Sequence, residues 1–287
     1  MKLAINWHSR LFKLVYHKIE STSNPRIKHL VRLRKSSRYR RETALFIVEG
    51  KREIEAFNAA GRNLEEIYFS QSMANEISSS SILSTLLERV PSFELSEDAI
   101  NKVSYRQHGS KFIGVAKTWN LKLRSPIDLN WKLVLVLDEV EKPGNLGAIL
   151  RTAEALGVDA ILLSDSCVDF FNPNVIRSSM GLFATMPVLM AEKREVHEFL
   201  KQANLEIVGT SSKAQTSIYE KQFQSKIALV MGSESTGLGE FWEKHCHSMI
   251  TIPMIGRASS LNLNCATTGV LMEINRRKQS LQASKPR

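Results

Sequence analysis

The sequence lacks the long apolar segments that membrane proteins and secreted precursors carry. No apolar run approaches the ~18 residues that a helix needs to cross a bilayer, and the strand-like run from Leu133 to Leu137 has the length of a buried strand. Near the N-terminus, apolar and basic residues alternate at Trp7, Arg10 and Leu11 without the continuous apolar core of a signal peptide. We therefore expect a cytoplasmic protein that has no transmembrane segment.

Cysteine is scarce, which disfavours disulfides and structural zinc. The three cysteines, Cys167, Cys246 and Cys265, are far apart and show no C-x-x-C spacing. We expect buried, unreactive thiols. A metal site made of His245, Cys246 and His247 is disfavoured because adjacent side chains cannot all turn toward one ion. We therefore expect no metal.

The common nucleotide-binding signatures are also missing. The sequence has no G-x-x-x-x-G-K-[ST] motif, and no G-x-G-x-x-G motif leads from a strand into a helix. Acidic residues are outnumbered, because 39 Lys and Arg face 29 Asp and Glu and leave a net charge of +10. This excess favours a polyanionic partner, which releases counterions when it binds.

The basic charge is concentrated between Asn24 and Arg41. Leu30, Val31 and Leu33 offer an apolar edge on which a helix can dock, and the arginines would then face outward. A solvated helix face is one interpretation. We favour contact with an RNA backbone, because guanidinium groups bind phosphates in bidentate fashion. The candidate RNA-binding residues are Arg26, Lys28, Arg32, Arg34, Lys35, Arg38, Arg40 and Arg41.

The chain divides where polar residues, with Pro126 and Asp128, separate two strand-like segments. We predict a small α/β domain at 1–122 and a second domain at 128–287. In the second domain, apolar strands alternate with helices, which indicates an α/β fold with a parallel sheet covered on both faces. Ligands of such sheets bind beyond the carboxyl ends of the strands.

Three polar, glycine-containing turns follow strand-like runs of the second domain. They have the sequences PGNLG at 143–147, GSESTGLG at 232–239 and PMIG at 253–256. Glycine allows a ligand to approach the backbone closely, because it has no Cβ. Any one of these turns alone is a weak signal, whereas the three together and in this order are specific.

The segments 137–163, 229–240 and 250–266 resemble the three motifs of the SpoU, or TrmH-like, branch of the SPOUT methyltransferases. The resemblance covers 132–278, and residues 23–50 are similar to the substrate-binding domain that many of these enzymes carry. It implies a C-terminal trefoil-knotted α/β fold and a homodimer whose active site borrows residues across the interface. It also implies S-adenosyl-L-methionine as cofactor and methylation of a ribose 2′-hydroxyl in RNA.

The resemblance also implies roles for individual residues. Backbone groups of the loops would bind the cofactor, so side-chain identity matters less there. The matching cofactor-binding positions are Thr210, Gly232, Ile252, Pro253, Met254 and Leu261. The matching catalytic positions are Asn145, Arg151, Glu234, Ser260 and Asn262. Two positions, Lys142 and Asn264, depart from the family pattern, which commonly has an acid and a small hydroxyl residue there, and both bear on RNA preference.

Helix capping is the alternative interpretation of Asn145, Glu234, Ser260 and Asn262, and Arg151 has the alternative of a solvent-exposed helix position. The resemblance points to Arg151 for proton removal, but a guanidinium group is almost always protonated. We therefore expect Arg151 to bind a phosphate or the developing alkoxide, with Glu234 holding either Arg151 or its loop in register.

A separate N-terminal module is typical of enzymes that act on large folded RNA, which favours ribosomal RNA as the substrate. Transfer RNA, methylation of a base nitrogen, and an RNA-binding dimer without catalysis remain alternatives.

Overall fold

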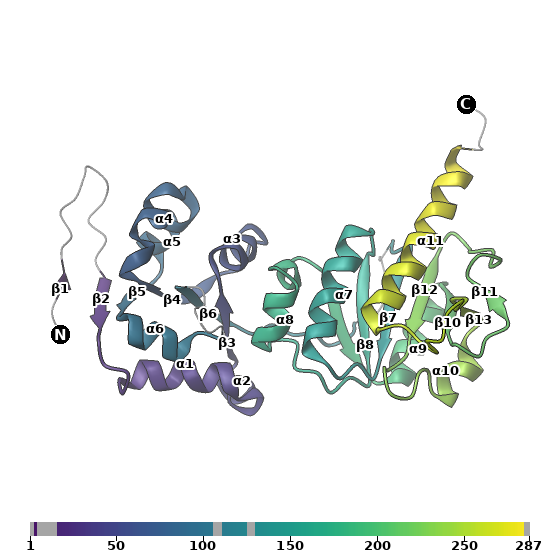
Figure 1. The fold of residues 1–287 in the computed structure, drawn as a ribbon, viewed down its shortest axis with the longest axis horizontal. Helices are drawn as coiled ribbons and strands as arrows, with labels where there is room; N and C mark the ends of the chain where they lie inside the picture. Colours follow the sequence, from purple (N-terminus) through teal and green to yellow (C-terminus); the bar gives the residue numbers. More distant parts are fainter. Residues whose placement is uncertain (1–2, 5–15, 106–110, 125–129, 284–287) are drawn as a thin grey trace. The chain divides into compact units, whose positions relative to one another are not determined.

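The computed structural model describes residues 3–4, 16–105, 111–124 and 130–283. Tertiary contacts divide the chain into two compact units (Figure 1). Unit 1 comprises Met1–Trp119 together with Asp169–Thr185, and unit 2 comprises Asn120–Val168 together with Met186–Arg287. The alternating N-terminal residues and the predicted boundary at Pro126 and Asp128 lie outside the described residues.

Unit 1 is built on a mixed sheet with the strand order β1-β2-β5-β4-β6-β3. Strand β5 runs parallel to β2 and β4, whereas β6 runs antiparallel to β3 and β4. The strands are β1 (Leu3–Ala4), β2 (Tyr16–Ile19), β3 (Leu45–Glu49), β4 (Leu64–Ser70), β5 (Ser92–Leu95) and β6 (Phe112–Lys117). The helices are α1 (Pro25–Lys35), α2 (Ser37–Thr43), α3 (Lys51–Ala59), η1 (Gln71–Met73), α4 (Ala74–Ser79), α5 (Ser81–Arg89), α6 (Glu97–Val103), α8 (Pro173–Ser178) and η2 (Leu182–Ala184).

The start of helix α1 and its packing against the core both follow from its local sequence. Asn24 caps it by accepting a hydrogen bond from the backbone N–H of Arg26, and Pro25 occupies the first turn, where its missing N–H costs nothing. Ile27, Leu30 and Leu33 are fully buried in the core of unit 1. The predicted apolar docking edge is therefore present, with Ile27 in place of the half-buried Val31.

The segment Asp169–Thr185 belongs to unit 1 although it is distant in sequence from the rest of that unit. Phe171 and Phe183 pack against Phe46, at ring-centroid separations of 4.9 and 5.9 Å, and both rings also contact Trp119. Helix α8 of this segment contacts β3. The predicted domain limits at 1–122 and 128–287 remain a prediction, and this segment of the predicted second domain packs with the N-terminal residues.

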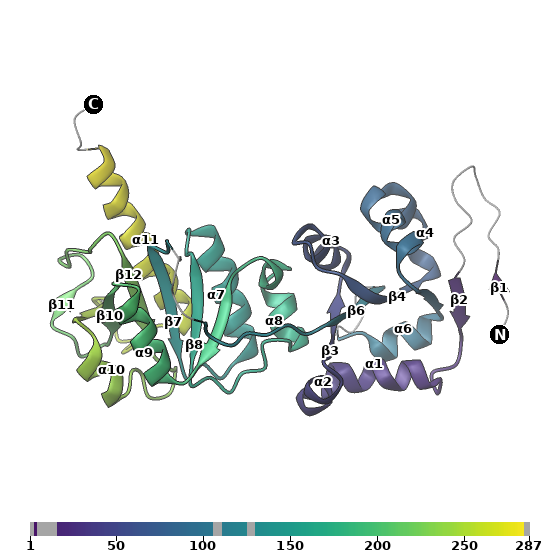
Figure 2. The same ribbon diagram turned by 180° about the vertical axis from the view of Figure 1, so that it is seen from behind.

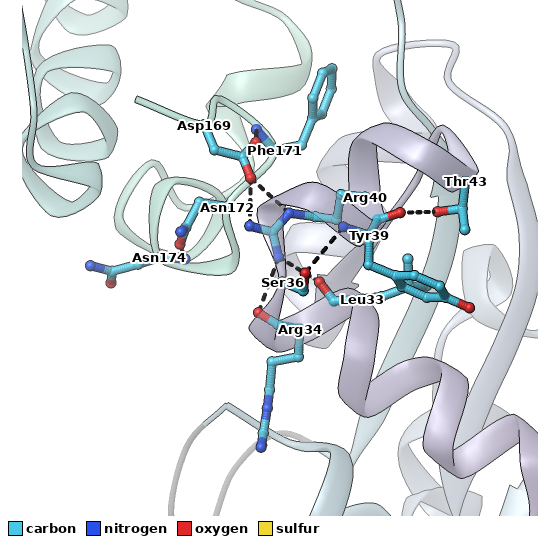
Figure 3. Close-up of polar contacts among 10 residues, drawn as sticks. All are labelled: Leu33, Arg34, Ser36, Tyr39, Arg40, Thr43, Asp169, Phe171, Asn172 and Asn174. Carbon is cyan, nitrogen blue, oxygen red and sulfur yellow. Dashed lines mark hydrogen bonds and ion pairs between the residues drawn. The ribbon is translucent and has the colours of Figure 1, made fainter. Parts of the chain in front are cut away.

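Arg40 holds the segment Asp169–Thr185 in place. The expectation that every arginine of the basic cluster faces outward is wrong for this residue. It is 2% exposed. Its Nε and Nη2 atoms donate to Asp169 Oδ2 at 2.8 and 2.5 Å, and Nη1 donates to the Leu33 and Arg34 carbonyl oxygens at 2.5 and 3.1 Å (Figure 3). A guanidinium group is buried here because nearly all its donors find acceptors, including carbonyls at the end of α1 that lack partners within the helix.

Unit 2 contains a sheet in which every paired strand is parallel, in the order β11-β13-β10-β12-β7-β8-β9. Its strands are β7 (Leu133–Asp138), β8 (Ala160–Ser164), β9 (Val188–Ala191), β10 (Glu206–Thr210), β11 (Thr216–Ser217), β12 (Ile227–Met231) and β13 (Ser248–Thr251). Its helices are α7 (Pro143–Ala155), α9 (Lys193–Gln202), α10 (Glu240–His245) and α11 (Leu263–Ala283). The predicted parallel α/β fold is confirmed.

Helices cover both faces of this sheet. Figures 1 and 2, seen from opposite sides, show α7 and α11 over one face and α9 and α10 over the other. Every residue of β7, β8 and β12 is buried, which explains why these strands have continuous apolar sequences instead of alternating ones. The trefoil knot remains a prediction.

Among the described residues, no helix is both long and apolar enough to cross a membrane. All three cysteines are free thiols, but the expectation that they are buried is wrong for two of them. Cys167 and Cys265, the latter on α11, are exposed, and Cys246 is half-buried. Burial raises the pKa of the third, Cys246, to about 12, so this thiol stays protonated.

Candidate functional site

The strand order of unit 2 brings the three glycine-containing turns together. Strand β12 lies between β10 and β7, and β13 lies beside β10, so the order along the sheet reverses relative to the sequence at the β7–β12 pair. All four strands are parallel, and their carboxyl ends therefore meet at one edge. Ligands of open α/β sheets bind at such a reversal.

Glu234 connects the loops at this edge. It lies in the loop after β12, and its Oε1 accepts hydrogen bonds from Asn145 Nδ2, in the first turn of α7, and from Asn262 Nδ2 at 2.9 Å. Lys142 Nζ lies 2.5 Å from Glu234 Oε2. The two asparagine side chains also meet, with Asn262 Nδ2 3.5 Å from Asn145 Oδ1. We call Lys142, Asn145, Glu234 and Asn262 the Glu234 hub; it joins all three predicted motifs.

A cavity of about 380 Å³ opens beside the hub, which is within the range of small-molecule sites. Apolar residues such as Met231, Ile250 and Leu238 form part of its wall, and backbone and hydroxyl groups of the loops form the rest. Five of the six predicted cofactor-binding residues line it, and Pro253 is not among the lining residues. The five are Thr210, Gly232, Ile252, Met254 and Leu261.

Gly232 is required by close backbone packing in this wall. A Cβ on Gly232 would lie 2.1 and 2.3 Å from the carbonyl carbon and oxygen of Gly237. Ser233 and Gly237 exchange two backbone hydrogen bonds of 3.1 Å, and Gly237 has a φ of +71°. The loop therefore folds back tightly on itself, and only glycine fits at position 232.

Helix capping, the alternative role for these residues, is found at Asn262 but not at Glu234. Asn262 does both jobs, because its Oδ1 accepts from the backbone N–H of Asn264 at 3.0 Å while its Nδ2 donates to Glu234. Glu234 has only side-chain donors in the hydrogen bonds described, so a cap is not its role there. Ser260 is exposed and lines the cavity.

Arg151 lies apart from the Glu234 hub. It is exposed on α7, six residues after Asn145, which turns it about 240° around the helix axis. Among the described residues, Arg151 has no hydrogen bond or ion pair, and the partners of Glu234 are Lys142 and the two asparagines. Of the two roles expected for Glu234, holding the loops is the one present within this chain.

The two positions that depart from the family pattern occupy different environments. Lys142 is 67% exposed, and its hydrogen bond to Glu234 raises the pKa of the Lys142 ammonium above its usual value. Asn264 is half-buried between α7 and α11, where its Oδ1 accepts from Thr152 Oγ1 at 3.0 Å. Lys142 thus faces the solvent at the site, whereas Asn264 contributes to helix packing.

Several residues that line the cavity were not predicted from the sequence. Ser211, Ser212 and Lys213 line it directly after the carboxyl end of β10, and Glu243 lines it from α10. The rule that ligands bind beyond strand ends was sufficient to identify the first three. Asp138, at the buried carboxyl end of β7, has its pKa raised by burial, although a 2.6 Å hydrogen bond from Ser164 opposes the shift.

The basic residues of α1 and α2, in unit 1, separate into three groups. Arg34 and Arg40 are used within the fold, since Arg34 donates to the Val103 and Ser104 carbonyls. Arg26 is exposed but paired with Glu66, and Arg38 is exposed and paired with Glu42. The other four basic residues are exposed, and none of them lies within ion-pair distance of a described carboxylate. They are Lys28, Arg32, Lys35 and Arg41.

The cavity fits the expected cofactor, S-adenosylmethionine. Its apolar wall suits an adenine ring, and the exposed hydroxyl and backbone groups of the loops suit the ribose and the amino-acid end. Among the described residues, no group of three or more His, Cys, Asp or Glu side chains is arranged to hold a metal ion.

Comparison with protein families gives two matches. Residues 132–272 match the SpoU rRNA methylase family, and residues 24–114 match the MRM3-like substrate-binding domain. A curated relative from Haemophilus ducreyi, the 23S rRNA (guanosine-2′-O-)-methyltransferase RlmB, is 39% identical over 150 residues. That alignment covers 52% of this chain and 61% of the relative's length.

Solved structures match over both units. A crystal structure described as an RNA 2′-O ribose methyltransferase is 33% identical with a TM-score of 0.79, covering 91% of this chain and 99% of the other. An AdoMet-bound rRNA methyltransferase from Sinorhizobium meliloti is 25% identical with a TM-score of 0.80, covering 91% and 98%. With these matches and with the three motifs gathered at one edge of the sheet, the chain belongs to the SpoU methylase family.

Proposed function

We propose that this protein methylates a ribose 2′-hydroxyl in RNA, with S-adenosylmethionine as the methyl donor and ribosomal RNA as the substrate. The observation that carries the proposal is the cavity beside the Glu234 hub, because one site combines a cofactor-sized space with polar side chains from three loops. Relatives that are named as 2′-O-methyltransferases support the same reaction.

When bound, the cofactor supplies a methyl group activated on a sulfonium. The residues of this chain have to hold the 2′-hydroxyl in line with that methyl group and exclude water. Glu234 fixes the three loops, and Asn145 and Asn262 are held beside it as hydrogen-bonding groups for the ribose. Ser260 lines the cavity from the third loop. Glu234 already accepts three donors, so its role is to position the loops.

Arg151 completes the site of a second copy in a homodimer. It is exposed, it is turned away from Asn145 on α7, and it has no partner among the described residues, as expected of a residue used by another subunit. Its guanidinium group binds the phosphate or the alkoxide that forms as the hydroxyl loses its proton. A symmetric dimer then has two equivalent sites, each with Arg151 from the other subunit.

The four exposed, unpaired basic residues of α1 and α2 bind the RNA backbone. Lys28, Arg32 and Lys35 follow one face of α1, and the Arg32 guanidinium lies 3.9 Å from the centre of the Tyr39 ring. Each phosphate contact releases counterions, so binding weakens as salt increases. The matching relatives are named as enzymes that act on ribosomal RNA, and we propose a cytoplasmic location because ribosomes function in the cytoplasm.

Methyl transfer from labelled S-adenosylmethionine to total RNA of cells that lack the protein tests the reaction, and mapping of 2′-O-methyl groups identifies the nucleotide. Arg151→Ala should abolish transfer and leave cofactor affinity nearly unchanged. A protein that binds the RNA and S-adenosylmethionine but transfers no methyl group would refute the catalytic proposal. Methyl groups found on bases would refute the ribose assignment.

Mixing two inactive variants tests the shared site. Arg151→Ala and Asn262→Ala should each be inactive alone. After unfolding and refolding together, about a quarter of wild-type activity should return, because half of the dimers are mixed and each of those has one intact site. Activity that stays at zero after verified mixing would place Arg151 in its own subunit's site.

A further inference from the structure

Lys142 belongs to the Glu234 hub and is charged, but the proposed reaction gives it no role. Its side chain makes no capping hydrogen bond to α7, although the residue occupies the N-cap position. Its Nζ lies 2.5 Å from Glu234 Oε2, and 67% of the side chain is exposed. The Glu234 side chain is 22% exposed, but a pair whose ammonium group is this exposed contributes little to stability. Neither capping nor stability explains a lysine at this position.

We propose that Lys142 binds an RNA phosphate next to the ribose that is methylated. The inference rests on the proposed function. Glu234 and Leu263 line both the cofactor cavity and the small cleft that Lys142 borders, so the Lys142 ammonium lies at the rim of that cavity. Every internal ribose of RNA is bonded to two phosphates. A ribose that reaches the cavity therefore brings phosphates to its rim.

The chemistry of the ammonium group suits this task. A lysine has three N–H donors on a flexible stem, so one can stay on Glu234 while the others donate to a phosphate oxygen. The positive charge also offsets Glu234, whose carboxylate would otherwise repel the phosphates that approach the site.

The alternative is that Lys142 only neutralises Glu234 and keeps its loop in place. The two roles differ in what they change. A phosphate ligand alters the Michaelis constant for RNA and its dependence on salt, and leaves cofactor affinity unchanged. A residue that only supports the loop alters cofactor affinity and turnover, because the same loop forms the wall of the cofactor cavity.

The experiment uses the full chain with four proteins: wild type, Lys142→Met, Lys142→Arg and Lys244→Met. Lys244 is the matched control, because its Nζ also lies 2.5 Å from a carboxylate, that of Glu240, and it is also 67% exposed. Methyl transfer to total RNA from cells lacking the protein is measured at several salt concentrations. Calorimetric titration gives the affinity for S-adenosylmethionine, and thermal unfolding confirms that each variant folds.

For Lys142→Met we expect a Michaelis constant for RNA about tenfold higher, with turnover number and cofactor affinity within about twofold of wild type. The slope of log(kcat/KM) against log salt should become shallower by about 0.7, the value for one lost phosphate contact in single-stranded RNA. Lys142→Arg should retain the wild-type slope, because it keeps the charge. Lys244→Met should match wild type throughout.

The outcomes separate the two proposals. A wild-type Michaelis constant and salt slope in Lys142→Met overturns the phosphate contact and leaves the proposed function standing. Loss of cofactor affinity in that variant with an unchanged salt slope also overturns it, and assigns Lys142 to the loop. A wild-type protein that transfers no methyl group overturns both proposals.

Discussion

Two ion pairs with the same N–O separation, one in each unit, have opposite uses. Arg40 and Asp169 in unit 1 lie 2.5 Å apart with side chains 3% and 17% exposed. Lys142 and Glu234 in unit 2 also lie 2.5 Å apart, and the Glu234 side chain is 22% exposed, but that of Lys142 is 67% exposed. A buried charge that loses its partner costs several kcal/mol, whereas an exposed one costs little. Burial therefore decides which pair maintains the fold and which is available for function.

The largest effect is expected from Asp169→Ala. The substitution leaves the Arg40 charge buried without its carboxylate and should lower the free energy of unfolding by about 3–5 kcal/mol. Urea unfolding of the full chain measures it. The double variant Arg40→Met with Asp169→Leu removes both charges and should recover part of the loss, because the Leu33 and Arg34 carbonyl oxygens still lose the donor that Arg40 supplies. Equal destabilisation in the single and double variants would mean that lost packing, not the unpaired charge, is the cause.

Glu234→Ala comes next and acts on activity. Without the carboxylate, Asn145 and Asn262 lose their common acceptor, and a shift of about 1 Å in a reacting group costs roughly 100-fold in rate. We therefore expect turnover to fall about 100-fold in single-turnover methyl-transfer assays, with an unfolding free energy within about 1 kcal/mol of wild type. A variant that unfolds as readily as Asp169→Ala would contradict the comparison of the two pairs.

Gly232→Ala tests whether the same site depends on the backbone as well as on charge. The added Cβ meets the Gly237 carbonyl group at 2.1–2.3 Å, and backbone atoms cannot rotate away as a side chain does. We expect affinity for S-adenosylmethionine to fall at least about tenfold, measured by calorimetry. Gly239→Ala is the matched control in the same loop, since a Cβ there meets nothing within 4 Å. It should bind the cofactor as wild type does.

The smallest expected effect is on the pH dependence of stability, and it comes from two histidines, one in each unit. Burial lowers the pKa of His29 in unit 1 and of His197 in unit 2 below the usual 6.5. Below pH 6.5 the unfolded chain then binds more protons than the folded one, so stability falls as the pH drops from about 6.5 toward the folded-state values. Above pH 6.5 the two residues contribute nothing.

Urea midpoints at pH 7.5 and 5.5 measure this effect. The wild-type midpoint should be lower at pH 5.5, and His29→Asn with His197→Asn should reduce that difference. If the difference between the midpoints at the two pH values is unchanged in the double variant, other groups cause the acid sensitivity.

The edge of the sheet that carries the site was predictable from local sequence, because polar turns after buried strands mark the carboxyl edge of a parallel sheet. The individual residues Gly232, Thr210 and Met254, which line the cavity, were implied by the family resemblance. The gathering of Asn145, Glu234 and Asn262 was implied by the family resemblance. Their shared hydrogen bonds were not predictable, since they depend on β12 lying between β7 and β10. The sequence gives no local signal of that order.

By itself, the sequence determined the parallel α/β fold, the loops that form the cofactor cavity and the family. The fold and the loops follow from hydrophobic periodicity and glycine positions, which act over a few residues. The family follows from the resemblance of three segments to its motifs. Only the tertiary structure showed that Arg40 is buried, because its partner Asp169 is 129 residues away in the sequence. It also showed that Arg151 lies on another face of α7 from Asn145 and that Lys142 contacts Glu234. Contacts between distant residues depend on how the strands and helices pack, and a local pattern does not specify them.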